Sequence, residues 1–353
     1  MRLLKIITAA FLACSTAAAP LNQSTPGSIP GTTSHYVGAG GHRYHYLSST
    51  PSHPSKGTVL LLHGFPDFSY AWRYQVPFLT SLGYRVIAPD LLGYADTDSP
   101  CELSNWAFKK MSADMAELLD QVAPGERIIL GGHDWGAGLA YNFAMWHPDY
   151  LKAFFTISVP YVRLWLGPTA EWVDTLDLVQ NGTFPNLGYQ MQWRDPAVDR
   201  NFTSSVQVAQ FLNAGFGGLT AEGEAGVSPE EGIFYDKLPL LGPNPLVNGT
   251  EFDFYVEKIH QKGMRGGFNW YRVRRMDWED ELPFARAGVF KFKTPSLFIA
   301  AEKDAFMPPK VYEGVGQYFE DLTIEKLDTG HWAMWEDPKG VNGILQKWID
   351  SLE

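Results

Sequence analysis

Cysteine is nearly absent from this chain, which has Cys14 and Cys101 among 353 residues. Cys14 lies in an N-terminal segment whose removal is expected, so the mature chain is predicted to have no internal disulfide. A secreted protein without disulfides needs a large packed core. A chain of this length with 14% aromatic residues can supply one.

Positive charge and long apolar runs are also scarce. The chain has 28 Lys and Arg against 39 Asp and Glu, a formal net charge of −11. This acidic balance argues against nucleic acid or an anionic membrane surface as a partner. The apolar run at residues 6–13 is too short to span a membrane, so no integral membrane span is expected.

The N-terminus has the features of a secretory signal peptide over residues 1–19. Arg2 and Lys5 give a basic start, residues 6–13 are mostly apolar, and small residues follow. An uncleaved signal anchor is the alternative. Residues 20–34, rich in Ser, Thr, Pro and Gly, are predicted to be a flexible leader. The chain is therefore expected to be secreted or to lie in the lumen of the secretory pathway. Four Asn-x-Ser/Thr triplets fit that route and a glycoprotein: Asn22, Asn181, Asn201 and Asn248.

From residue 35 onward, strand patterns alternate with helical patterns, which predicts an α/β fold with a mostly parallel central sheet. Strands are predicted at 44–47, 58–62, 85–89, 296–300 and 323–327, and helices at 70–82, 111–122 and 341–352. The regularity is lost over 161–283, where helical patches such as 205–213 and 252–262 lie among glycines and prolines. We interpret 161–283 as an inserted helical cap on a core made of residues 35–160 and 284–353.

The chain is organised around residues 128–138, with the sequence IILGGHDWGAG. Three apolar residues run into glycines, and a helical pattern follows, which predicts a strand, a sharp turn and a helix. Gly132-x-Asp134-x-Gly136 has the spacing of a nucleophile elbow, with Asp134 where serine usually stands. The alternative interpretation is that Asp134 only caps the following helix.

An aspartate at an elbow suits a different electrophile from serine. A carboxylate that attacks a saturated carbon forms an alkyl ester, and a histidine-activated water can hydrolyse that ester. Serine attacking the same carbon would form an ether, which is a dead end. The substrate is therefore expected to carry an electrophilic saturated carbon, as epoxides and haloalkanes do.

Further candidate site residues follow other predicted strands. In parallel sheets, ligands bind beyond the carboxyl ends of the strands. Phe65, after the strand at 58–62, and Trp135, after the nucleophile, can each offer a backbone N–H to an oxyanion. Asp304 and His331 follow the strands at 296–300 and 323–327, so the three members of an Asp-His-Asp triad would come along the chain in the order nucleophile, acid, histidine. His331 would activate water, and Asp304 would orient the imidazole.

The chain resembles the epoxide hydrolases of the α/β-hydrolase superfamily. The resemblance runs from about residue 44 to the C-terminus and rests on HGFP at 63–66, GHDWG at 132–136, AEKD at 301–304 and TGHW at 329–332. It implies that Tyr189 and Tyr271, within the cap, are the family's ring-opening tyrosines and that the Phe65–Pro66 peptide bond is cis. An opened epoxide keeps its leaving oxygen as an alkoxide, which a tyrosine hydroxyl can protonate.

The resulting hypothesis is hydrolysis of a small apolar epoxide with water, through an alkyl-aspartyl ester, without a metal or organic cofactor. Two alternatives stay open: a haloalkane dehalogenase using the same triad, and a non-catalytic protein that binds an apolar ligand. The absence of serine from the elbow disfavours an ordinary esterase. Cap aromatics predict an apolar tunnel or cap core: Trp165, Phe184, Trp193, Phe211 and Phe216.

Overall fold

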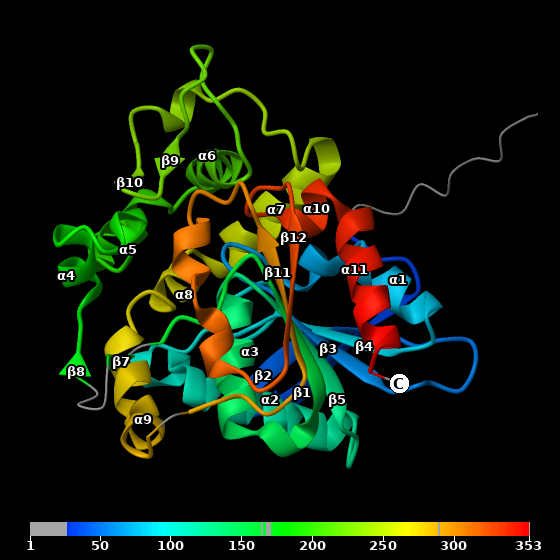
Figure 1. Cartoon of the computed structure of the whole chain (residues 1–353). Coiled ribbons are helices and arrows are strands. Elements are labelled where there is room, and N and C mark those ends of the chain that lie inside the picture. Colours follow the sequence, from blue (N-terminus) through cyan, green and yellow to red (C-terminus); the bar gives the residue numbers. More distant parts are fainter. Residues whose placement is uncertain (1–26, 164, 167–170, 289, 353) are drawn as a thin grey trace, which may run out of the picture.

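Figure 1 shows a computed structural model of the chain, which describes residues 27–163, 165–166, 171–288 and 290–352. The predicted signal peptide and Asn22 lie outside the described residues, as does the Trp165 side chain. Among the residues that are described, no helix is both long and apolar enough to cross a membrane.

The centre of the molecule is an eight-stranded sheet in the order β1-β2-β4-β3-β5-β6-β11-β12. β1 and β2 pair antiparallel at one edge, β2 pairs antiparallel with β4, and the other neighbours are parallel. The strands are β1 (Thr32–Ala39), β2 (His42–Ser49), β3 (Thr58–Leu62), β4 (Arg85–Pro89), β5 (Ile128–His133), β6 (Leu151–Ile157), β11 (Ser296–Ala301) and β12 (Leu322–Leu327). The predicted α/β class with a mostly parallel sheet is confirmed.

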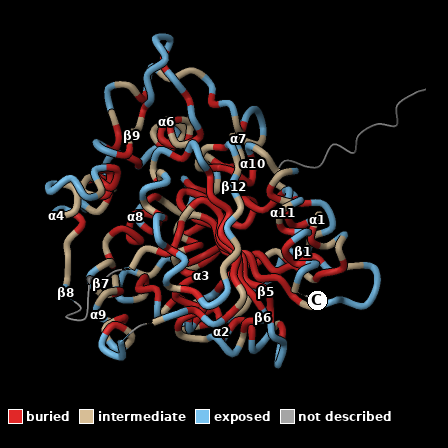
Figure 2. Tube along the Cα trace, in the orientation of Figure 1, coloured by how far each residue is buried: buried red, intermediate tan, exposed pale blue. Residues whose placement is uncertain are grey.

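Helices cover both faces of this sheet. α1 (Gln75–Ser81) and α11 (Pro338–Asp350) contact each other on one side, and α2 (Phe108–Val122) and α3 (Trp135–Trp146) contact each other on the opposite side (Figure 1). α10 (Ala333–Glu336) precedes α11. β3 and β5, which are covered on both faces, are buried at every residue, and Figure 2 shows buried residues concentrated in the sheet.

A long insertion separates β6 from β11. Its helices are α4 (Thr175–Gln180), α5 (Tyr189–Trp193), α6 (Ser205–Gly215), α7 (Gly249–Lys262), α8 (Arg265–Asn269) and α9 (Arg274–Arg286). Two short antiparallel pairs lie in the same segment: β7 (Trp165–Leu166) with β8 (Glu171–Trp172), and β9 (Val227–Ser228) with β10 (Gly232–Ile233). The predicted cap boundary at residue 283 falls inside α9, which continues as one helix to Arg286.

Two local predictions are corrected by the structure. The expected helix over residues 70–82 is a 3₁₀ turn (Ser69–Trp72) followed by α1. Pro77 explains the break, because it lacks an N–H and is tolerated in the first turn of a helix but not in its interior. The leader predicted to extend to residue 34 ends earlier, since Thr32 already pairs with Ser49 across β1 and β2.

The strand register brings the predicted site loops together. Leu62 at the end of β3 pairs with Gly132 near the end of β5, so the loop carrying Phe65 lies beside Asp134. Ala301 and Leu327 pair at the ends of β11 and β12. The loops that follow these four strands therefore meet at one edge of the sheet.

Candidate active site

β5 ends in a sharp turn that leads through Asp134 into α3. The backbone of Asp134 has φ 52° and ψ −124°, a region that side-chain-bearing residues rarely occupy. A Cβ on Gly132 would lie 2.4 Å from the carbonyl oxygen of Gly136, and a Cβ on Gly136 would lie 2.2 Å from that of Leu62. Glycine on both sides therefore permits the turn. The Asp134 side chain makes no capping hydrogen bond to α3, which disfavours a purely capping role.

The loop after β3 contacts the Asp134 carboxylate directly. The backbone N–H of Phe65 donates to Oδ1 of Asp134 at 2.7 Å, and the Phe65–Pro66 peptide bond is cis, as the resemblance implies. A Cβ on Gly64 would lie 2.4 Å from the Cβ of Asp134, so only glycine allows this approach. His63 fixes the loop by accepting a hydrogen bond from the N–H of Leu91 at 2.8 Å.

Trp135 supplies the other predicted oxyanion donor. It is the first residue of α3, and N–H groups in the first turn of a helix have no acceptor within the helix. Both predicted donors, Phe65 and Trp135, thus lie next to Asp134, one in the β3 loop and one in the elbow itself.

His331 lies between two carboxylates. Its Nδ1 is 2.7 Å from Oδ2 of Asp304, and its Nε2 is 3.4 Å from Oδ2 of Asp134. Its main-chain oxygen accepts a hydrogen bond from the Ser158 hydroxyl at 2.8 Å and lies 2.9 Å from Nε2 of His133. The structure therefore brings together all three predicted triad residues and holds the histidine through its ring and its backbone.

The pKa values describe an ion pair at the centre of the site. Burial lowers the pKa of His331, but the charge of Asp304 and hydrogen bonds to Asp134 and Asp304 raise it to about 10. Burial raises the pKa of Asp134, whereas the hydrogen bond and charge of His331 bring it below its usual value. Burial, followed by the charge of His331, lowers the pKa of His133 to about 4. The resting site thus holds an ionised Asp134 and a protonated His331, with a neutral His133 behind them.

Tyr189 and Tyr271 come from the insertion and lie at the same cavity as Asp134. Their ring centroids are 5.9 Å apart, both residues are buried, and both line a cavity with Asp134 and His331. Burial and then the Asp134 charge raise the pKa of Tyr189. Burial, then Tyr189, and then Asp134 raise the pKa of Tyr271. Both hydroxyls therefore stay protonated at neutral pH and can donate hydrogen bonds.

The cavity has two arms that share Asp134, Tyr189 and Met307. The smaller arm, next to His331, is lined by aromatic side chains that include Trp193 and Phe211. Phe184 lines the larger arm, whereas Phe216 packs against other aromatic rings.

Sequence reasoning missed several residues of the larger arm, among them Gln190, Arg274 and Glu281. Gln190 follows Tyr189 and donates a hydrogen bond to its hydroxyl at 3.2 Å. Arg274 and Glu281 lie on α9 together with Asp277, at positions i, i+3 and i+7. That spacing puts three charged residues on one helix face, which is a signal that the sequence contained.

Comparisons with known proteins agree with this geometry. Residues 57–338 match the family model described as alpha/beta hydrolase fold. The chain is 38% identical over 338 residues to epoxide hydrolase srdG of Neurospora crassa, covering 92% of this chain and 97% of that one. It is 31% identical to epoxide hydrolase 2 of Siraitia grosvenorii, covering 86% and 94%. The crystal structure of epoxide hydrolase A from Mycobacterium thermoresistibile has a TM-score of 0.74 and 29% identity, covering 91% and 99%. The chain therefore belongs to the epoxide hydrolases of the α/β-hydrolase fold.

Proposed function

We propose that this epoxide hydrolase converts its substrate to a vicinal diol in two steps, with Asp134 as nucleophile and His331 as the base for water. The observation that carries the proposal is that the two carboxylate oxygens of Asp134 have different neighbours. Oδ1 accepts a hydrogen bond from the N–H of Phe65, while Oδ2 faces the imidazole of His331 and the cavity.

In the first step, Oδ2 of Asp134 attacks one ring carbon and the bond from that carbon to the epoxide oxygen breaks. Tyr189 and Tyr271 hold the epoxide oxygen, and one of them gives it a proton. An alkyl ester of Asp134 results, with Oδ1 as its carbonyl oxygen. Positioned general acids of this kind contribute about 10²–10⁴-fold to rate.

Ester formation removes the charge of Asp134, so His331 gives up its proton, which returns to the tyrosine that donated one. In the second step, the neutral His331 takes a proton from water, and the hydroxide adds to the ester carbonyl carbon. Asp304 stabilises the imidazolium that forms. The N–H groups of Phe65 and Trp135 hold the negative charge that develops on Oδ1. The bond from the carbonyl carbon to Oδ2 then breaks, and Oδ2 takes the proton of the new carboxyl group. The diol leaves with the oxygen that was Oδ2, and Asp134 is again a carboxylate beside a protonated His331. This scheme uses no metal or organic cofactor, and turnover is expected to survive chelators.

The substrate class is proposed to be an epoxide with a largely apolar body. Phe65, Trp193 and Phe211 line the smaller arm with aromatic faces, and Met307 lies where the two arms meet. Burial of apolar substrate surface against such walls contributes about 25 cal/mol per Å².

Isotope labelling in oxygen-18 water tests the covalent scheme. With enzyme in excess, the diol of the single turnover should contain unlabelled oxygen from Asp134. With substrate in excess, the diol of later turnovers should contain oxygen-18. His331→Gln should accumulate the ester, seen as a mass adduct. Asp134→Ala should form neither diol nor adduct, whereas Asp328→Ala, at an exposed carboxylate, should behave as wild type. Oxygen-18 in the first-turnover diol would contradict nucleophilic attack by Asp134.

One structural feature favours haloalkane dehalogenation as the alternative function. Nε1 of Trp135 is buried, and Trp135 lines the larger arm of the cavity beside Asp134, as an indole that binds halide would. The tyrosine pair and the named relatives favour epoxide opening. Bromoalkanes should therefore release no bromide under conditions in which epoxides yield diol, and rapid bromide release would reverse the assignment.

A secretory route is the remaining part of this proposal. It is supported by the signal-like residues 1–19 and by three glycosylation triplets whose asparagines are exposed: Asn181, Asn201 and Asn248. Expressed from its own N-terminus in a eukaryotic host, the enzyme should appear in the medium or lumen with glycans that an endoglycosidase removes. An unglycosylated enzyme retained in the cytosol would contradict this route.

A further inference from the structure

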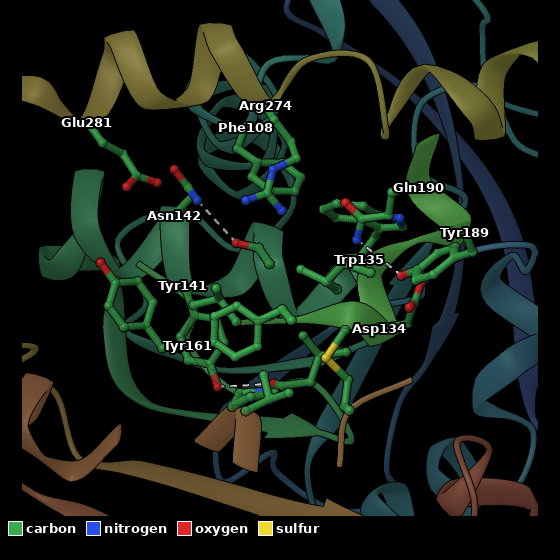
Figure 3. A pocket seen from close by; sticks show the side chains of 18 residues that line it. Phe108, Asp134, Trp135, Tyr141, Asn142, Tyr161, Tyr189, Gln190, Arg274 and Glu281 are labelled. Carbon is green, nitrogen blue, oxygen red and sulfur yellow. Dashed lines mark hydrogen bonds between the residues drawn. The ribbon is translucent and has the colours of Figure 1, made fainter. Parts of the chain in front are cut away.

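The larger arm of the cavity has a polar end. Near Asp134 its walls include Trp135, Tyr189 and Met307, and further along they include Asn142, Tyr161, Arg274 and Glu281. Figure 3 shows Glu281, Asn142 and Arg274 on one side of the arm, away from Asp134 and Tyr189. The polar end is defined here as Tyr161, Arg274 and Glu281.

Three atoms of the polar end lack a hydrogen-bond partner within the described part of the chain: Nε of Arg274, Oε2 of Glu281 and the hydroxyl of Tyr161. Glu281 is 2% exposed and Tyr161 is 5% exposed. A buried polar atom without a partner costs about 1–3 kcal/mol. Such atoms lining one arm of a cavity are typical of a site that binds a polar group.

The neighbouring Asp277 has a structural role, whereas Arg274 Nε, Glu281 Oε2 and the Tyr161 hydroxyl have no structural partner among the described residues. Asp277 lies on the same face of α9, and its Oδ1 accepts a hydrogen bond from the backbone N–H of Phe108 at 2.8 Å. That bond ties α9 of the insertion to α2 of the core. Arg274 forms no ion pair with Asp277 or Glu281 within 4.0 Å among the described contacts, so its Nε stays available to the cavity.

The donors and acceptors at the polar end select among possible substrate groups. Nε of Arg274 donates, Oε2 of Glu281 accepts, and the Tyr161 hydroxyl does either. An ammonium group would lie beside the Arg274 cation, and a carboxylate has no hydrogen to donate to Oε2 of Glu281. A hydroxyl carries no charge and offers one donor and two acceptor lone pairs, so it satisfies both partners at once.

We propose that the polar end binds a hydroxyl group of the substrate, so that the preferred substrate is an epoxy alcohol whose hydroxyl and epoxide are joined by an apolar spacer. The epoxide then lies at Asp134 under Tyr189, with the spacer along the arm. This inference rests on the proposed function, because it assumes that Asp134 is the nucleophile.

The charge state of Glu281 agrees with a neutral ligand. Burial, and then the charge of Asp277, raise the pKa of Glu281 well above its usual value. A protonated Glu281 beside a hydroxyl can accept through one oxygen and donate through the other. Nε of Arg274 has no partner among the described residues, so it can donate to the substrate oxygen.

The test measures kcat/KM on three sets of terminal epoxides of increasing chain length, ending in methyl, hydroxyl or carboxylate. At one spacer length, the wild-type enzyme should favour the hydroxyl over the methyl compound by about 5- to 100-fold, the factor for one buried polar pair. Equal values at every length, or a preference for the carboxylate set, would overturn the proposal. Absence of diol from all three sets would instead refute the proposed function.

Substitutions test whether residues of the polar end cause the preference for the hydroxyl over the methyl compound. Tyr161→Phe removes one hydroxyl and keeps the ring, and Glu281→Leu removes the acceptor. Each should lower the hydroxyl-to-methyl ratio by about fivefold or more while the methyl compound is still turned over. The matched control is Tyr312→Phe, which removes another buried, unpartnered hydroxyl outside both arms and should leave the ratio unchanged. If Glu281→Leu fails to fold, the Tyr161→Phe ratio decides. An unchanged ratio in that variant would overturn the proposal.

Discussion

Neutralising Asp134 should make His331 lose its proton at a lower pH. In the resting site, Nε2 of His331 lies 3.4 Å from Oδ2 of Asp134, and the pKa of His331 is raised to about 10. Alkylation turns the Asp134 carboxylate into an uncharged ester. Asp134→Asn reproduces that loss of charge without substrate, so the variant should show the pKa that His331 has when water must be activated.

The size of the shift follows from the two partners of the imidazole. An opposite charge at this range raises the pKa of a cation by about 1–3 units. In the variant the pKa of His331 should therefore fall by about 1–3 units, which corresponds to about 1.4–4 kcal/mol of interaction with Asp134. It should remain above its ordinary value of 6.5, because Asp304 still lies 2.7 Å from Nδ1.

The assay is a pH titration of the His331 ring nitrogens by NMR in the wild type and in Asp134→Asn, with mass spectrometry to confirm that the amide is retained. Asp328→Asn serves as the control. The Asp328 side chain is 78% exposed, and solvent screens its charge, so it should leave the pKa unchanged. A His331 pKa that is the same in wild type and Asp134→Asn, or a wild-type pKa near 6.5, would refute the reasoning.

Three further predictions concern the rate and the stability. Tyr189→Phe and Tyr271→Phe keep the rings but remove the proton donors, so the double variant should lower the single-turnover rate by about 10²–10⁴-fold, and an unchanged rate would remove both from the mechanism. Gly64→Ala places a Cβ 2.4 Å from the Cβ of Asp134, so kcat should fall by about 10²-fold while thermal unfolding still shows a folded protein. Wild-type kcat would show that the loop adjusts freely. Burial raises the pKa of Asp277 from 3.8 to about 7, so the folded state binds the extra proton and stability should fall as pH rises through that window. Asp277→Asn should therefore stabilise the protein more at pH above about 7 than near pH 4, as measured by urea unfolding, and equal effects at both would contradict the shift.

Most of the core could be predicted because its signals are local. β3 and β4 begin and end at the predicted residues 58–62 and 85–89, since short apolar runs bounded by turn residues mark buried strands. β6 was not among the predicted strands, because the exposed Lys152 interrupts its apolar run after the first residue. The prediction of one helix over 70–82 was wrong. Pro77 is tolerated only in the first turn of a helix, so α1 begins just before it, at Gln75.

The triad was predictable for a related reason. Asp134, Asp304 and His331 each follow a strand, and parallel strands end at one edge of a sheet, so chain order and strand position already place these residues together. The tyrosines lie in the irregular insertion, where no period links Tyr189 to Tyr271. Only the resemblance to a family could select them from sixteen tyrosines.

The sequence by itself thus determined the fold class and predicted the elbow at Asp134 and the order of Asp134, Asp304 and His331, because strand periodicity and the glycines around Asp134 restrict the backbone locally. The tertiary structure decided the 3.4 Å contact of His331 with Asp134, the meeting of the two tyrosines and the polar end of the larger arm. Those features depend on how the insertion packs on the core. Side chains far apart in the chain become neighbours there, and burial changes their charge states.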